Sequence, residues 1–173
     1  MKSNAVAPRP GDKWHMDKVV LKISGKYHYL WWAVDQDGNI LDILVQSRRD
    51  TKAALRFFRK LLKGLEYVPR VLITDKLRSY GAAIKETMPD VEHRQHKGIN
   101  NRVENSHRPT RRRERVMQRF KSPGHAQRFL SARDPINNHF RPRRHLMTSE
   151  QYRKFRNQAF QEWTDVANNL KAA

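Results

Sequence analysis

Three acidic residues lie in stretches of sequence that are otherwise apolar or basic. Asp17 lies in WHMDKVVLKI, Asp75 ends VLITD, and Glu104 lies in NNRVENSHRPTRRRER. Metal-assisted cleavage or joining of a phosphodiester needs a few carboxylates that converge on two divalent ions ~3.5–4 Å apart. Magnesium prefers oxygen ligands and keeps several waters, so two or three carboxylates and a phosphate suffice. The three acids therefore predict a site for metal-dependent chemistry on a nucleic-acid backbone.

Each acid taken singly also has a structural interpretation. Asp75, at the end of an apolar run, is also typical of a turn or helix cap. Asp17 interrupts an apolar strand-like run, which is costly unless the carboxylate is paired or faces solvent. Glu104 among arginines is typical of a surface ion pair. A shared site is favoured only by the three residues together and by the order of the elements that carry them.

The composition of the chain points to a polyanionic partner. Its 173 residues carry a formal net charge of +19, with 36 Lys and Arg against 17 Asp and Glu. Such a charge attracts nucleic acid through phosphate neutralisation and counterion release. We find no apolar run of the ~18 residues that a membrane span needs and no hydrophobic stretch typical of a signal peptide. We therefore expect DNA as partner, no membrane, and a cytoplasmic, nucleoid-associated location.

Residues of two further types limit the possible chemistry. The chain has no cysteine, which excludes disulfides, thiolate zinc sites and cysteine nucleophiles. His93 and His96 form a His-x-x-His pair, for which hydrogen bonding or phosphate contact is favoured over zinc because no acid pair or cysteine accompanies it.

Basic residues are concentrated after Glu104. On a helix, positions three, four and seven residues beyond Glu104 share its face, although Pro109 would kink or restart such a helix. A solvated charged face is the structural alternative, but so many basic residues favour phosphate contacts that set register without reading sequence. The predicted DNA-binding residues are Lys76, His107, Arg108, Arg111, Arg112 and Arg113.

The amino-terminal part of the chain predicts three antiparallel strands. Residues 14–24, 27–35 and 40–45 are rich in β-branched and aromatic residues. We place turns at Gly25-Lys26 and at Asp37-Gly38, the latter being a strong hairpin signal. Within the second strand, the neighbours Trp31 and Trp32 point to opposite faces, and burial is the default expectation for both.

Helices and short strands alternate after residue 50. Residues 51–63 have helical apolar spacing, with Asp50 or Thr51 as cap and Gly64 as stop. We then expect a strand at 70–74, a helix at 79–87, a last short strand at 91–94, and helices at 124–134 and 149–163 that Pro135, Pro142 and a basic link separate. The order β-β-β-α-β-α-β-α predicts an α/β, ribonuclease H-like fold, in which a mixed five-stranded sheet is flanked by helices.

We expect three regions in the chain. Residues 1–12 form a flexible amino-terminal arm, residues 13–140 form the core, and residues 141–173 form a basic helical extension at the carboxyl end. In this fold the first and fourth strands are neighbours, so that Asp17 and Asp75 meet across the sheet and a following helix brings Glu104 over the same edge.

Several motifs together resemble one known family. The stretches PRPGDKWHMDKV, VLITDKLRSYGAA and VEHRQHKGINNRVENSHRPTRRRER, with the hairpin and helix between them, are similar to the catalytic domain of bacterial insertion-sequence transposases of the sixth family, over roughly residues 8–145. The resemblance implies a DDE core with Asp17, Asp75 and Glu104 as catalytic and metal-binding residues. It also implies Mg²⁺ as cofactor with Mn²⁺ as substitute, cleavage at DNA element ends, joining to target DNA, and a homo-oligomer on DNA.

The chain departs from the family pattern at two points. Members usually carry a helical DNA-binding region ahead of the first motif, and we expect that region to be missing here. The first acid is commonly followed by another acid, whereas here it is followed by Lys18. Because adjacent strand residues face opposite ways, Lys18 need not enter the metal site. These departures leave two alternatives, a non-catalytic DNA-binding relic with the same fold and, on charge alone, an RNA-binding protein.

Overall fold

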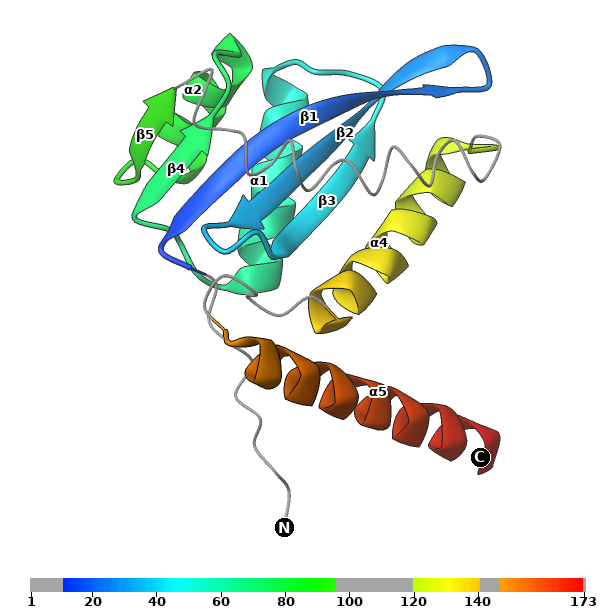
Figure 1. The fold of residues 1–173 in the computed structure, drawn as a ribbon. Helices are drawn as coiled ribbons and strands as arrows, with labels where there is room; N and C mark the ends of the chain where they lie inside the picture. Colours follow the sequence, from blue (N-terminus) through cyan, green and yellow to red (C-terminus); the bar gives the residue numbers. More distant parts are fainter. Residues whose placement is uncertain (1–10, 96–119, 141–146, 173) are drawn as a thin grey trace. The chain divides into compact units, whose positions relative to one another are not determined.

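The computed structural model describes residues 11–95, 120–140 and 147–172, which separate into two compact units at Leu130 and Ser131. The first unit is built on a five-stranded sheet in the order β3-β2-β1-β4-β5 (Figure 1). β1 (Lys13–Ile23), β2 (Lys26–Asp35) and β3 (Ile40–Gln46) are antiparallel, and β4 (Val71–Thr74) and β5 (Glu92–Gln95) run parallel to β1. The predicted mixed sheet is confirmed.

Turn chemistry sets the register of the antiparallel strands. β1 and β2 are joined by a two-residue turn whose residues Ser24 and Gly25 have φ of 49° and 79°, as a type I′ hairpin requires. The prediction of a turn at Gly25-Lys26 was therefore displaced by one residue. In the second hairpin, Gly38 has φ of 84°, and the buried Asp35 carboxylate accepts the backbone N–H groups of Asp37 and Asn39 at 2.8 and 2.9 Å.

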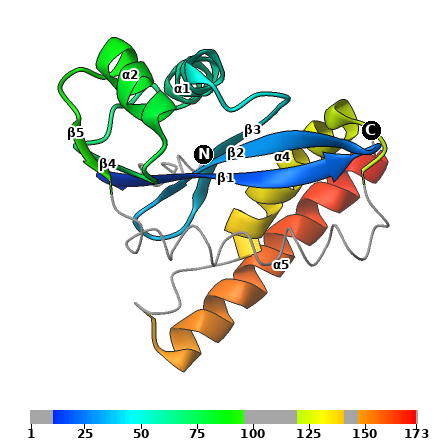
Figure 2. The same cartoon turned by 90° about the horizontal axis from the view of Figure 1, so that it is seen from above.

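Two helices cover one face of this sheet. α1 (Thr51–Leu65) begins at Asp50, whose side chain accepts the N–H of Ala53, and α2 (Arg78–Thr87) follows β4. Figure 2 shows both helices on the same side of the strands. Gly64 lies inside α1, which ends one residue later with Glu66 at φ of 53°. The prediction that Gly64 ends the helix was wrong because the backbone takes its left-handed residue two positions further on.

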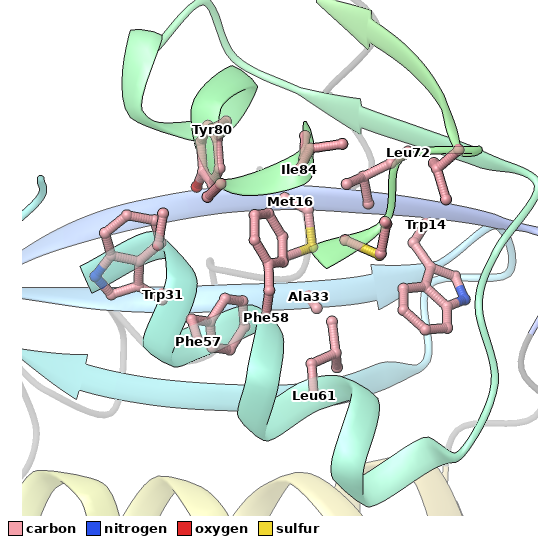
Figure 3. Close-up of a cluster of buried hydrophobic side chains, with 14 of the residues drawn as sticks. Trp14, Met16, Trp31, Ala33, Phe57, Phe58, Leu61, Leu72, Tyr80 and Ile84 are labelled. Atoms are coloured by element: carbon pink, nitrogen blue, oxygen red, sulfur yellow. The ribbon is translucent and has the colours of Figure 1, made fainter. Parts of the chain in front are cut away.

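The first half of α4 (Pro123–Phe140) covers the opposite face. Its Ala126 and Leu130 pack with β-strand residues in a second buried cluster, and its Gln127 accepts the N–H of Val45 at 2.7 Å. Trp31 lies in the cluster under α1 and α2, shown in Figure 3, and Trp32 lies in the cluster under α4. Both tryptophans are fully buried, as their alternation predicts. The sheet therefore has an apolar core on each face.

The second unit contains the end of α4 and α5 (Ser149–Ala172). His139 and Phe140 contact α5, with the Phe140 and Phe160 ring centroids 4.9 Å apart. Pro135 lies inside α4, so the prediction that it separates two helices was wrong. A proline removes one backbone hydrogen bond, and the helix continues past that local loss. Within the described residues, no helix is long and apolar enough to cross a membrane.

Candidate active site

The parallel pairing of β1 with β4 makes neighbours of the strand that carries Asp17 and the strand that leads to Asp75. Lys13 pairs with Val71, which lies 58 positions further along the chain. The next two pairs, Trp14–Leu72 and His15–Ile73, keep the same offset. The same offset relates position 17 to position 75, one residue beyond the end of β4. The pairing itself ends at His15 and Ile73, so it makes the chain segments that carry the two acids neighbours without fixing how their side chains lie.

Asp75 shapes the connection from β4 to α2. One of its carboxylate oxygens, Oδ1, accepts the backbone N–H of Leu77 at 3.0 Å, and Leu77 is the residue that precedes the first turn of α2. The turn interpretation of Asp75 is therefore correct. The other oxygen, Oδ2, remains available for a cation, so the structural and the chemical interpretations of this residue do not exclude each other.

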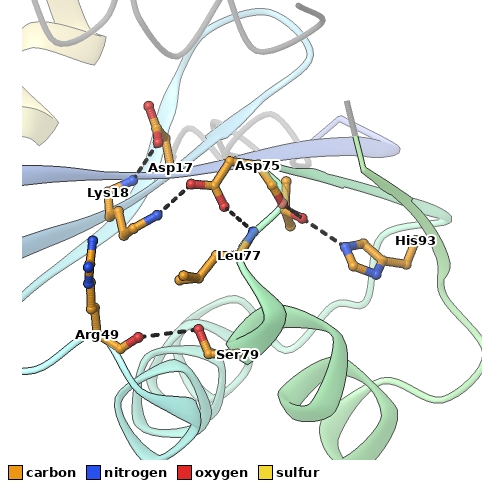
Figure 4. A network of polar contacts seen from close by, with 8 residues as sticks. Asp17, Lys18, Arg49, Asp75, Leu77, Ser79 and His93 are labelled. Atoms are coloured by element: carbon orange, nitrogen blue, oxygen red, sulfur yellow. Dashed lines mark hydrogen bonds and ion pairs between the residues drawn. The ribbon is translucent and has the colours of Figure 1, made fainter. Parts of the chain in front are cut away.

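A lysine ammonium group already lies on that second oxygen. Lys18 Nζ is 2.5 Å from Asp75 Oδ2, and the exposed fractions of the two side chains are 13% and 32%. Figure 4 shows Asp17 and Lys18 leaving β1 on opposite faces, as strand alternation requires, with Asp75 on the Lys18 side. Lys18 therefore faces away from Asp17, as alternation predicts, and contacts Asp75. Alternation does not govern Asp75, because Asp75 lies beyond the last paired residue of β4.

Asp17 is partly buried near the middle of β1. Its Oδ1 accepts the backbone N–H of Lys18 at 2.7 Å, and in the antiparallel register it lies opposite Trp32. The structure therefore fixes the position of this carboxylate on a strand that is paired with β2 at that residue.

The charges of both carboxylates affect the pKa of a buried tyrosine. Tyr80, in the first turn of α2, is fully buried beneath this part of the sheet. Burial raises its pKa well above the usual range, and the negative charges of Asp75 and Asp17 raise it further. Its hydroxyl has no hydrogen-bond partner among the described residues. Tyr80 is therefore a neutral polar group at this site that sequence patterns gave no reason to select.

His93 and Thr74 form a second polar contact at the ends of β5 and β4. His93 Nε2 lies 2.8 Å from Thr74 Oγ1, which in turn donates to the backbone carbonyl of Asp75 at 2.8 Å (Figure 4). Burial lowers the pKa of His93. The hydrogen-bonding interpretation of His93 is confirmed, and His96 lies outside the described residues.

The remaining predicted site residues divide into two groups. Lys76 is exposed directly after Asp75. Glu104 and the predicted phosphate contacts His107, Arg108, Arg111, Arg112 and Arg113 lie outside the described residues. Among the residues that are described, no group of three His, Cys, Asp or Glu side chains could hold a metal ion, and the side chains of Asp17 and Asp75 lie on opposite sides of β1 (Figure 4).

Comparison with known proteins identifies the family. A family model described as "DDE domain" matches residues 11–143, which is more than half of the chain. The chain belongs to this family of insertion-sequence transposases. The match includes both Asp17 and Asp75 and the whole sheet that positions them.

Individual relatives agree with this assignment. The DDE domain is 35% identical over 102 residues to the transposase for insertion sequence-like element IS431mec of Staphylococcus aureus strain Mu50, covering 56% of this chain and 45% of that protein. The same values hold for the transposase of element IS257 in transposon Tn4003 of Staphylococcus aureus. An uncharacterised protein of Yersinia pseudotuberculosis, pYV0051, is 34% identical over 79 residues, with 44% and 74% of the two chains covered. The chain thus spans about half the length of the staphylococcal transposases.

A solved structure shares the fold. The catalytic core domain of BIV integrase superposes with a TM-score of 0.50 at 15% sequence identity, over 68% of this chain and 80% of that one. At this identity the likeness concerns the fold alone, and it agrees with the ribonuclease H-like arrangement of the sheet.

Proposed function

We propose that this DDE domain cleaves and joins DNA phosphodiesters in transposition, acting on element ends and target DNA as a homo-oligomer. The observation that supports this most strongly is the parallel pairing of β1 with β4, because it makes neighbours of the strand that carries Asp17 and the strand that leads to Asp75. Membership of the DDE family and the net charge of +19 support DNA as the substrate, because phosphate neutralisation drives such binding.

The two carboxylates have the chemistry of divalent-metal ligands. Asp17 and Asp75 supply hard oxygen atoms of the kind that Mg²⁺ prefers, and Asp75 Oδ2 already contacts one cationic group, Lys18 Nζ. In our proposal Asp17, Asp75 and Glu104 hold Mg²⁺, or Mn²⁺ in its place. Bound there, the metal would supply Lewis acidity for the activation of a water or a DNA 3′-hydroxyl.

The protein's own groups would orient the substrate. Asp75 is held by the Leu77 N–H through Oδ1 and by Lys18 Nζ through Oδ2, so its carboxylate has a fixed orientation. The exposed Lys76 stands next to it as a contact for phosphate, and we propose the same role for His107, Arg108, Arg111, Arg112 and Arg113. Such contacts position DNA without reading its sequence.

A cleavage and strand-transfer assay tests this proposal. Pre-nicked DNA and Mn²⁺ are supplied to the parent chain and to Asp17→Asn, Asp75→Asn and Glu104→Gln. Each variant is expected to lose product formation while keeping DNA affinity, because each removes one carboxylate charge and changes little volume.

Asp42→Asn is the matched control, because Asp42 is an acidic strand residue that pairs with Lys60 and lies on β3, away from the site. Product from Asp75→Asn at the parent rate would contradict the site assignment. Tight, salt-sensitive DNA binding without product in any protein, including the parent, would support a non-catalytic relic instead.

A further inference from the structure

The outer part of the β1–β2 hairpin presents a continuous row of side chains. The register pairs Lys18 with Trp31, Val20 with Tyr29, and Lys22 with Tyr27. Because alternate residues of a strand share a face, these pairs lie on one face of the hairpin. The row begins at Lys18, which contacts Asp75, and ends near the turn.

The helices cover only the inner end of this row. Trp31 is fully buried beneath α1 and α2, whereas the exposed fractions of Val20 and Tyr27 are 51% and 64%. The other face of the same strands is buried, since Leu21 and Ile23 pack in the cluster under α4. The outer part of the hairpin is therefore packed against the core on one face and exposed to solvent on the other.

Cations accompany the aromatic rings on the open face. Lys22 Nζ lies 6.0 Å from the Tyr27 ring centroid, and the Arg49 guanidinium carbon lies 5.7 Å from that of Tyr29. Figure 4 shows the Arg49 side chain extending from the loop beside Ser79 toward Lys18. We call Val20, Lys22, Tyr27, Tyr29 and Arg49 the hairpin strip.

We propose that the hairpin strip binds unpaired nucleotides of a DNA strand that leads to Asp75. Exposed rings flanked by Lys and Arg are how proteins bind single strands, because bases stack on the rings and cations contact the phosphates. A duplex keeps its bases stacked on one another, so it cannot use Tyr27 in this way. The inference that the bound strand leads to Asp75 rests on the proposed function, whereas the binding of a single strand to the hairpin strip does not.

Binding to single-stranded and duplex DNA tests the strip. Fluorescence anisotropy with a labelled oligo-dT and a duplex of equal length is measured at 0.3 M salt, which weakens phosphate contacts made elsewhere. We expect Tyr27→Ala to weaken single-strand binding about tenfold, Tyr27→Phe to retain it within about twofold because the ring remains, and duplex affinity to be unchanged in both. Lys22→Gln weakens single-strand binding as well.

Lys63→Gln is the matched control for charge. Lys63 lies in the last turn of α1, and the chain that follows reaches the beginning of β1, where Tyr67 contacts Trp14. It is thus at the opposite end of β1 from Lys22, and its substitution is expected to leave single-strand affinity unchanged.

Photocrosslinking supplies an independent readout. An oligonucleotide with 5-iodo-deoxyuridine in an unpaired overhang is irradiated with the full chain, and the adduct is expected on Tyr27 or Tyr29. Equal losses for single strand and duplex in Tyr27→Ala, or no loss in either, would overturn the proposal, as would adducts confined to other residues. Because both readouts measure binding, they hold for an inactive chain, and a cleavage failure with intact strip binding would refute the proposed function alone.

Discussion

Replacing Lys18 should strengthen the binding of a divalent metal. Lys18 Nζ lies 2.5 Å from Asp75 Oδ2, so a metal ion that takes this oxygen as a ligand must first displace the ammonium group. Lys18→Gln removes the positive charge and keeps a side chain of similar length. The parent chain is thus expected to bind Mn²⁺ more weakly than the variant.

The expected gain in Mn²⁺ affinity depends on how far the Lys18–Asp75 ion pair is exposed to solvent. Exposed pairs contribute roughly 0.2–1 kcal/mol, while loss of one partner from a fully buried pair costs about 3–5 kcal/mol. With side-chain exposures of 13% and 32%, this pair lies between those limits, at about 1–2 kcal/mol. Since 1.4 kcal/mol is a factor of ten, Lys18→Gln should bind Mn²⁺ about 5- to 30-fold more tightly.

Titration with Mn²⁺, followed by electron paramagnetic resonance of the free ion, measures this affinity without any DNA. Lys22→Gln is the matched control, because Lys22 lies on the same face of β1 with its Nζ over the Tyr27 ring. Urea unfolding without metal checks that Lys18→Gln is folded. The reasoning is refuted if Lys18→Gln binds Mn²⁺ no more tightly than the parent, while retained binding by Asp75→Asn would remove Asp75 from the ligand set.

Three further predictions concern stability. Glu66→Gly should raise the free energy of unfolding, measured by urea titration, by about 1 kcal/mol. The reason is that Glu66 has φ of 53°, a conformation that glycine adopts without strain. A lower free energy of unfolding in the variant would contradict this. Phe58→Ala should cost about 3–5 kcal/mol, since Phe58 is fully buried, and a change below 1 kcal/mol would refute its core role. Arg70 lowers the pKa of Asp12 mainly by hydrogen bonding. The Asp12–Arg70 pair therefore contributes its full stabilisation at a pH above the ordinary pKa of the carboxyl group. That stabilisation is lost as the pH falls through the lowered pKa of Asp12 in the folded chain. Arg70→Gln should remove that dependence in acid titrations followed by circular dichroism, and an unchanged profile would exclude the pair as its source.

Local patterns were sufficient to predict most of the fold. The alternation at Trp31 and Trp32 correctly predicts burial on both faces, because a strand's side-chain period of two is set by backbone geometry. The end of α1 could not be predicted from Gly64, since where a helix stops depends on tertiary packing as well as on glycine preference. Pro135 illustrates the same limit, because a helix can tolerate one missing hydrogen bond.

The candidate site was predictable only in part. The element order correctly predicts β4 beside β1, because strand order follows from the crossover through α1. The contact of Lys18 with Asp75 depends on the direction in which the chain turns after β4, which no residue pattern encodes. Tyr80 escaped selection because a tyrosine in an amphipathic helix has no chemical signature until its neighbours are known.

The parallel pairing of β1 with β4 also has a definite place in the order of folding. β1, β2 and β3 are joined by short turns, so their contacts close small loops. β4 lies 58 positions further along the chain than the β1 residues with which it pairs, so its contacts close a loop that includes β2, β3 and α1. Closing a longer loop costs more entropy and slows folding. The arrangement of β1 beside β4 is therefore a late and cooperative product of folding, and a partly folded chain that has only its antiparallel hairpins carries the positive charge without that arrangement.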